Sequence, residues 1–295
     1  VFNGCYHGTV DDAMVCLDNG RTANRPGLVG QITDLSALAT VVEFNDLAAV
    51  EAALATGEIA AVLTEPVMTN SCMVLPEPGF HAELRNLTRA HGALLIIDET
   101  HTQSTGHGGY TKTFGLDPDI FVIGKCVAGG LPTALWGLRP DLATRFATYN
   151  ATRPPGHSGM GTTLSANPLQ FAALLATLTQ VATPTALAKM ERGAQRLATG
   201  LSCAIAAHGA PWHVVRVGAR VEFICAPGPL RNGFEAARAH APEVEAVTHL
   251  ALLNRGSLIA PFHNMMLVSP VTTRAQIDRL VANFHAVLGM LFSKD

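Results

Sequence analysis

The sequence predicts a mostly parallel, doubly wound α/β sheet followed by a smaller C-terminal α+β domain. Two short segments, 93–99 and 119–125, are apolar runs that end abruptly in a charged residue and have the length and composition of strands buried on both faces. Helix-like segments alternate with such runs, which predicts right-handed parallel crossovers. From about residue 211 the pattern changes to short strands and helices. We therefore expect a large domain at 1–195 and a small domain at 196–295.

The first half of the chain contains most of the predicted sheet. Pro78 and Gly79 introduce one of its helices, and Gly92 ends it. The strands are expected at 1–6 (a fragment entering a turn), 59–64, 93–98, 119–124 and about 133–138. The helices between them are expected at 46–57 and 80–91.

The second half is expected to be richer in helix. Long apolar and mixed segments predict helices at 164–180, 184–208, near 240–255 and at 272–292. Short β-rich runs predict one or two strands in 214–225 and further strands at 257–260 and 264–269. A soft domain boundary is expected within 181–212.

Composition favours a soluble α/β enzyme. The chain has 295 residues, of which 48% are hydrophobic, and this is ample for one large domain and a small one. A net charge of −3 without any Lys/Arg-rich run argues against a nucleic-acid partner. No apolar stretch reaches about 18 residues, so no membrane span is expected. Six scattered cysteines without CxxC spacing favour reduced thiols and a cytoplasmic location.

Asp98 and Lys125 end two of the predicted strands. Open α/β sheets bind ligands outside the carboxyl ends of their strands, where these two groups would stand one strand apart. A lysine can form an imine with a cofactor, and a carboxylate can keep a pyridinium nitrogen protonated. The alternative is that both are strand-end charges that face solvent or pair with each other. The chain has only four lysines, which are Lys112, Lys125, Lys189 and Lys294.

Several motifs occur along the chain in one order, and together they resemble the class III aminotransferases. The motifs are Gly4-Cys5-Tyr6-His7-Gly8, Thr64-Glu65-Pro66-Val67, Asp98-Glu99-Thr100-His101-Thr102, Ile123-Gly124-Lys125 with Gly129-Gly130, and Thr162-Thr163-Leu164-Ser165-Ala166-Asn167-Pro168-Leu169. The resemblance covers nearly the whole chain and is greatest to the glutamate-semialdehyde aminomutase and β-amino-acid aminotransferase branch. It implies the large domain of a fold-type-I transferase and pyridoxal 5′-phosphate (PLP) as cofactor.

The resemblance begins in the middle of the family's large domain. Relatives carry a preceding segment with a Ser-Gly-Thr loop that binds the cofactor phosphate at a helix N-terminus. No part of this chain resembles that loop, so we expect an incomplete enzyme that lacks the family's N-terminal segment. The glycine-rich run Gly106-His107-Gly108-Gly109-Tyr110 is expected to be a turn rather than a second phosphate site.

The resemblance assigns roles around the predicted crevice. Lys125 is expected to form the Schiff base and to act as general base and acid. Asp98 is expected to bind the pyridine nitrogen, with a strand-end cap as the alternative. Thr100 replaces the Val or Ile of relatives and is expected under the ring. His101 stands where relatives often have Gln, near the phenolic oxygen of the cofactor, or is a plain loop histidine.

Three residues from two other motifs, and one from the loop after the second motif, complete the expected site. Tyr6 resembles the aromatic residue that stacks on the cofactor ring, or is a core aromatic at a turn. His7 flanks Tyr6 and is included among the cofactor-binding residues. Glu65 ends the strand before Asp98 and is expected to order the hydrogen bonds of the site. Asn70 is a weaker candidate in the loop that follows.

Thr163 resembles a threonine that reaches the cofactor phosphate of a partner subunit. This role implies a homodimer with shared active sites. Thr162 is the alternative, because the glycine-rich residues before it leave the register open.

The expected reaction moves an amino group between an amine or amino acid and a keto or aldehyde substrate. In relatives a glutamate or an arginine near the last strand pair contacts the substrate, but residues 258–266 contain neither. We therefore expect an aminotransferase for a bulkier or less acidic amine, with Phe262 and His263 lining its pocket, unless both only pack at the domain junction. The alternatives are another PLP reaction, as in an aminomutase, racemase or decarboxylase, or a non-catalytic truncated relative.

Overall fold

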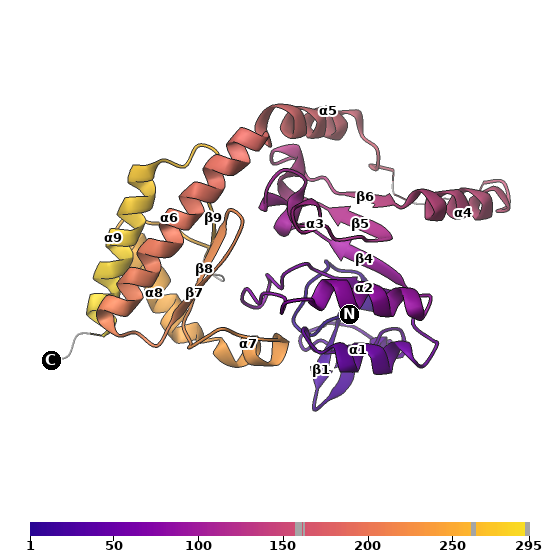
Figure 1. Cartoon of the computed structure of the whole chain (residues 1–295), viewed down its shortest axis with the longest axis horizontal. Coiled ribbons are helices and arrows are strands. Elements are labelled where there is room, and N and C mark those ends of the chain that lie inside the picture. Colours follow the sequence, from indigo (N-terminus) through magenta and orange to yellow (C-terminus); the bar gives the residue numbers. More distant parts are fainter. Residues whose placement is uncertain (157–160, 162, 261–263, 293–295) are drawn as a thin grey trace.

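The computed structural model describes residues 1–156, 161, 163–260 and 264–292. Figure 1 shows two lobes, one built around the sheet β3–β6 and the other around the sheet β7–β9. Helix α5 and the first turns of α6 run along one side and connect the two lobes (Figure 1).

The sheet of the first lobe has the order β3-β4-β5-β6. The bounds of these strands are β3 Ala61–Thr64, β4 Leu94–Asp98, β5 Ile120–Ile123 and β6 Leu135–Leu138. β3, β4 and β5 are parallel, which confirms the mostly parallel sheet that the sequence predicts. β6 pairs antiparallel with β5, because a parallel return needs a crossover of about a dozen residues or more. The short turn Lys125–Ala128 and the loop after it are too short to form one.

Helices pack on this sheet through their apolar faces. Phe80, Leu84 and Leu87 of α2 are buried at helical spacing. Asp46 caps α1 by accepting a hydrogen bond from Ala49 N at 3.0 Å. The helices of this lobe and of the connection are α1 Leu47–Leu54, α2 Phe80–Ala90, α3 Gly109–Phe114, α4 Pro140–Ala151 and α5 Pro168–Ala176.

The N-terminal residues differ from the prediction. Only an isolated bridge between Phe2 and Val42 forms where a strand fragment is expected at 1–6. A hairpin of β1 (Val15–Asp18) and β2 (Arg21–Asn24), which the sequence analysis missed, follows. Asn19 and Gly20 form its two-residue turn with φ of 48° and 75°, as Asn-Gly hairpin turns require.

The second lobe has its own core. Trp212, Phe223 and Phe284 lie in it, packed against buried residues of α6 that begin at Ala194. The predicted strand at 257–260 does not form. The elements are α6 Pro184–His208, β7 His213–Val217, β8 Arg220–Ile224, α7 Gly233–Ala239, α8 Pro242–Asn254, β9 Met265–Leu267 and α9 Arg274–Leu291.

Helix α6 continues without a break through residues 195 and 196, so the division into domains 1–195 and 196–295 remains a proposal. It is supported by the core of the second lobe, whose first residue is Ala194. Within the described residues, none of the helices alone has both the length and the apolar composition of a membrane span. The segments Pro168–Val181 and Pro184–His208, bent by 70° to each other, meet these two criteria only as a pair.

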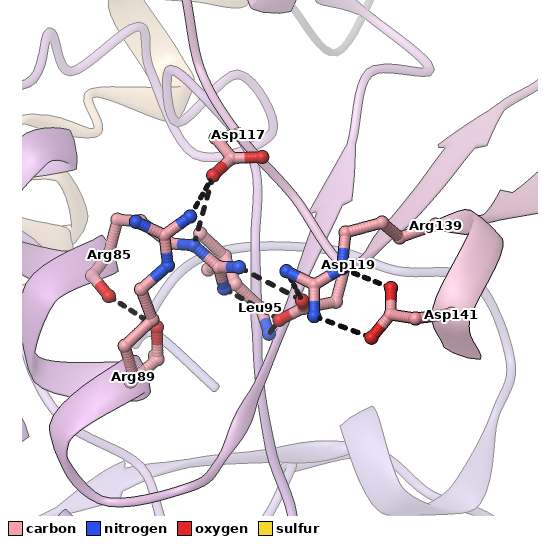
Figure 2. A network of polar contacts seen from close by, with 8 residues as sticks. Arg85, Arg89, Leu95, Asp117, Asp119, Arg139 and Asp141 are labelled. Atoms are coloured by element: carbon pink, nitrogen blue, oxygen red, sulfur yellow. Dashed lines mark hydrogen bonds and ion pairs between the residues drawn. The ribbon is translucent and has the colours of Figure 1, made fainter. Parts of the chain in front are cut away.

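Asp119 ties four elements together at the end of the sheet opposite the predicted site (Figure 2). Its buried carboxylate binds Arg85 of α2 through two hydrogen bonds of 2.6 and 2.9 Å. It also accepts a hydrogen bond from Leu95 N of β4 at 2.8 Å and lies 2.9 Å from Arg139 Nη1. Burial acts to raise the pKa of Asp119, but these partners outweigh it and hold the pKa below its ordinary value.

We predict that Asp119→Asn lowers the free energy of unfolding by about 3 kcal/mol at pH 7, because buried Arg85 loses its two-pronged counter-ion and keeps only the longer, 3.6 Å contact with exposed Asp117. Since the pKa of Asp119 is lowered on folding, its contribution is present above the unfolded value and is lost as the pH falls through the folded value. Urea unfolding at pH 7 and at pH 3 measures both effects, and the difference between the proteins should shrink at the lower pH.

Asp141→Asn is the matched control for this prediction. Asp141 pairs with the same Arg139 at the exposed end of the network, where an ion pair contributes little (Figure 2). Equal losses of stability in the two variants would show that the buried position of Asp119 has no special weight.

Candidate active site

Asp98 and Lys125 lie at one edge of the sheet. Asp98 is the last residue of β4 and pairs in register with Val122 of β5, and Lys125 begins the turn after β5. The Lys125 backbone has a φ of 56°, in the left-handed region that non-glycine residues rarely adopt. Such backbone conformations cluster at functional sites, because the surrounding structure must hold them in place.

The Asp98 carboxylate is held from two sides. Its Oδ2 lies 2.9 Å from His7 Nδ1, and its Oδ1 accepts a hydrogen bond from Thr100 N at 3.0 Å. Burial acts to raise the pKa of Asp98, but the hydrogen bonds from His7 and Thr100 outweigh it, so the pKa lies below its ordinary value. Asp98 therefore stays ionised at neutral pH and keeps lone pairs for a further donor.

A second chain of polar contacts starts at Glu65, directly after β3. Thr69 Oγ1 donates to the Glu65 carboxylate and lies 2.5 Å from His101 Nδ1. Tyr6 N donates to Glu65 Oε1 at 3.4 Å. Burial raises the pKa of Glu65 above its ordinary value. The segments 4–8, 64–69 and 98–102, far apart in the sequence, thus meet around two carboxylates.

The turns after β4 and β5 are joined by Gln103. Its Nε2 donates to Thr100 O at 3.0 Å and to Gly124 O at 2.8 Å. The Thr100 side chain packs beside Gly124, because a Cβ on that glycine would lie 3.6 Å from Thr100 Oγ1. This contact places Thr100 next to the residue that precedes Lys125.

Lys125 is exposed, and its ammonium group is partly desolvated. This desolvation lowers the pKa of Lys125 below its ordinary value, Asp98 opposes the effect, and Arg220 adds to it. Arg220 opens β8 in the second lobe and donates through Nε to His101 O. The positive field of Arg220 therefore reaches Lys125 from the other lobe.

A small polar cavity of about 230 Å³ lies beside this region. Asn70 lines it together with Glu222, which follows Arg220 by two residues and so lies on the same face of β8. Burial raises the pKa of Glu222 to about 7, although Met73 N donates to it at 2.6 Å.

The remaining candidates lie apart from Asp98 and Lys125. Thr163 is exposed in the turn before α5, and the structure gives it no contact with the other candidate residues that it describes. Thr162, Phe262, His263 and Lys294 lie outside the described residues. The glycine-rich run at 106–110 forms a turn into α3, as expected, and the Glu99 carboxylate already accepts hydrogen bonds from Tyr110 N and Thr111 N.

Three polar residues of this region are missing from the sequence analysis: Thr69, Gln103 and Arg220. Thr69 and Gln103 follow their motifs by a few residues and had no signal of their own. Arg220 did have a sequence signal, because the charged residues Arg220 and Glu222 alternate with the apolar Val221 and Phe223 in one strand. Charged residues on every second position of an otherwise apolar strand mark a polar face.

These residues fit PLP. Asp98 offers an ionised carboxylate for a ring N–H, and Lys125 offers an exposed amine of lowered pKa one strand away. A partly buried carboxylate and a lysine at adjacent parallel strand ends meet the needs of a pyridine cofactor held by a lysine.

Comparison with known proteins identifies the class to which this fold and site belong. The sequence model of the class-III aminotransferases matches residues 1–288. The chain belongs to this family, as its motifs predict.

The relatives narrow the branch. Glutamate-1-semialdehyde 2,1-aminomutase of Desulforudis audaxviator is 35% identical over 297 residues, which cover 99% of this chain and 67% of the relative. The structure of a glutamate-1-semialdehyde aminomutase from Pseudomonas aeruginosa has 47% identity and a TM-score of 0.93 over 98% of this chain and 65% of its own. β-Phenylalanine aminotransferase from Variovorax paradoxus has 28% identity and a TM-score of 0.82, with 98% and 63% covered.

The chain thus spans about two thirds of the length of these relatives. The Pseudomonas aeruginosa protein was solved with PMP, the amine form of the predicted cofactor, so this family binds PLP. The comparisons favour the aminomutase alternative over the intermolecular aminotransferase expected from residues 258–266.

We predict that PLP attaches to Lys125 alone, since it is the lysine beside Asp98. Borohydride reduction of the protein with PLP, followed by peptide mass mapping, should give one adduct on Lys125 that Lys125→Ala removes.

Lys112 and Lys189 are internal controls for this labelling. Lys189 donates to Pro270 O in the second lobe, and Lys112 lies in α3. Labelling that is spread evenly over the lysines would contradict a specific cofactor site.

Proposed function

We propose that the protein carrying this chain is a PLP-dependent aminomutase, which moves an amino group between adjacent carbons of one substrate. The observation that carries the proposal is the placement of Asp98 and Lys125 at the ends of adjacent strands, in a chain that is similar to aminomutases over nearly its whole length. Glutamate-1-semialdehyde, the substrate in the names of those relatives, is the proposed substrate.

The cofactor, when bound, supplies an electron sink that weakens bonds at the carbon bearing the amino group. Lys125 would hold it through Nζ. Asp98 would keep its ring nitrogen protonated by accepting the N–H, and the contacts of Asp98 with His7 and Thr100 N would fix the carboxylate for this role. Tyr6, on the turn that adjoins Glu65, would cover one face of the ring.

The Lys125 amine would also move the proton. Its lowered pKa raises the fraction of neutral amine near pH 7, as a general base requires. Nζ would take a proton from the carbon that carries nitrogen and return one to the neighbouring carbon. The overall change is an isomerisation and consumes no co-reactant. Thr69 and His101 would order this edge of the site through Glu65.

An intermolecular aminotransferase is the second candidate. One observation favours it: residues 258–266 contain neither the glutamate nor the arginine that contacts substrate in relatives. Such an enzyme would need a separate keto or aldehyde acceptor for each amine donor.

We predict that the PLP-loaded protein converts glutamate-1-semialdehyde to its isomer with the amino group on the terminal carbon, without any added acceptor. Lys125→Ala should lower the rate by at least about 100-fold, because the general base is lost. Chromatographic separation of the two isomers measures the reaction.

Lys112→Ala is the matched control and should leave the rate unchanged, because Lys112 lies in α3 rather than at the strand end. A strict requirement for a keto acid would favour the aminotransferase. Failure of both reactions in a protein that binds PLP would contradict both candidates.

We further propose a homodimer with shared sites. The segment from β6 to Val181, the last residue of the helical turn after α5, exposes many large apolar side chains, and Thr163 lies within it. These exposed residues are Trp136, Tyr149, Leu164, Leu169, Phe171, Leu175, Leu178 and Val181. Exposed apolar side chains in this number are typical of protein–protein interfaces, and Thr163 would then lie at an interface where two subunits can share a site.

We predict that the protein sediments as a dimer and that Thr163→Ala weakens PLP binding about 10-fold through loss of one charge-assisted hydrogen bond. Thr56→Ala, in the exposed turn after α1 and outside this segment, is the control and should have no effect. A monomer with full PLP affinity, measured by sedimentation and absorbance titration, would contradict the shared site.

The six cysteines support the proposed cytoplasmic location. All six are described and are free thiols. Free thiols are typical of reducing compartments.

A further inference from the structure

We propose that Arg220 binds the carboxylate of the substrate, and so makes the site specific for amino or carbonyl compounds that carry a carboxylate away from the reacting carbons. This inference rests on the proposed function and names its specificity-determining residue. None of the sequence motifs includes Arg220, and its position comes from the contact between the two lobes.

The Arg220 guanidinium has no ion-pair partner in the part of the chain that the structure describes. Arg85 and Arg139, by contrast, each pair with an aspartate. Its Nε donates to His101 O, and its Nη1 has only the thioether of Met265 at 3.3 Å. A half-buried guanidinium satisfied in this way keeps most of its capacity to bind an anion.

One edge of the guanidinium is not used by the protein. Within the described part of the chain Nη2 has no hydrogen-bond acceptor and is not completely buried. A carboxylate could therefore bind Nη1 and Nη2 in the two-pronged geometry typical of arginine.

Arg220 lies close enough to the reactive lysine to act on the same molecule. Its charge lowers the pKa of Lys125, and Glu65 acts on both cations. Its backbone hydrogen-bond acceptor, His101 O, belongs to the turn that follows Asp98. A substrate whose amino carbon lies at Lys125 could extend its carboxylate across the crevice to Arg220.

The position of Arg220 is fixed by close backbone packing. Gly218 has a φ of 52°, and a Cβ there would lie 2.5 Å from Thr105 Cα, so the β7–β8 turn sits directly on the segment after Asp98. Ala219 N donates to Ser104 O at 3.3 Å. Arg220 thus belongs to the second lobe but is held against the first, as a precise recognition residue requires.

The cofactor phosphate is the other anion that Arg220 could bind, and the experiment separates the two. The probes are 4-aminopentanoate and 2-aminopentane, which differ only in a carboxylate replaced by a methyl group. Each is added to the PLP-loaded protein, and the change in cofactor absorbance gives the apparent affinity and rate. Calorimetry with unreactive pentanoate gives a binding constant that does not depend on turnover.

Arg220→Met should lower the affinity for 4-aminopentanoate and for pentanoate by about 10- to 100-fold, the effect of losing a charged hydrogen-bonded pair. The affinities for 2-aminopentane and for PLP should be unchanged. Arg220→Lys should restore part of the lost affinity for the two carboxylates. Arg216→Met is the matched control, because Arg216 lies on neighbouring β7 and contacts Gly218 O and Glu191 instead.

Two results would overturn the proposal: equal loss for both amines, which indicates a structural role, and loss of PLP affinity with the carboxylate preference kept, which assigns Arg220 to the phosphate. The amine half of the reaction is common to aminomutases and aminotransferases. Failure of the proposed isomerisation would therefore leave this preference measurable, and the two failures remain distinguishable.

Discussion

The register between β4 and β5 is the constraint on which the candidate site depends. It places Asp98 opposite Val122 and so puts Lys125 just past the same edge. Asp119 secures this register from the other end: its N–H donates to Leu95 O at 2.9 Å, and its carboxylate accepts from Leu95 N at 2.8 Å. A slip by one residue would turn Asp98 to the opposite face of the sheet. The buried ion pair with Arg85 thus serves the geometry of a site that it does not touch.

The site is assembled from segments that are distant in sequence. The turn at residues 4–8 contributes His7 to Asp98, the loop after β3 contributes Thr69 to His101, and Gln103 joins the turns after both central strands. The first two contacts fix side chains of the polar site, and the Gln103 contacts fix the backbone on either side of it. Preorganisation of this kind spares the reorganisation that flexible groups would need during reaction.

The sequence predicts the parallel strands well, because each is an apolar run of β-formers that ends in a charged or glycine residue. The direction of β6 was not assigned from the sequence, although the roughly eight residues between the strands expected at 119–124 and about 133–138 are too few for a parallel crossover. The hairpin at 15–24 was missed even though Asn19-Gly20 is a strong turn signal, because its strands carry little apolar alternation.

For the site, the sequence points to the residues next to motifs and not to those that tertiary packing supplies. Asp98, His7 and Lys125 could be predicted from the sequence because each lies in a motif. The structure brings them together at one edge of the sheet. Arg220 is placed at the site by the close packing of Gly218 on Thr105, a contact between residues more than a hundred positions apart in the sequence. No local pattern encodes a contact of that kind.

The charges of Arg220 and Lys125 are coupled. Two cations that share a partly desolvated crevice repel, and this repulsion favours the neutral amine that a proton acceptor needs. A substrate carboxylate bound at Arg220 would cancel much of that field and raise the proton affinity of Lys125 just when it must take a proton from the substrate. An amine without a carboxylate would leave the field in place. Selection for the carboxylate and activation of the base would then follow from one electrostatic interaction, with Glu65 and Asp98 balancing the remaining charge.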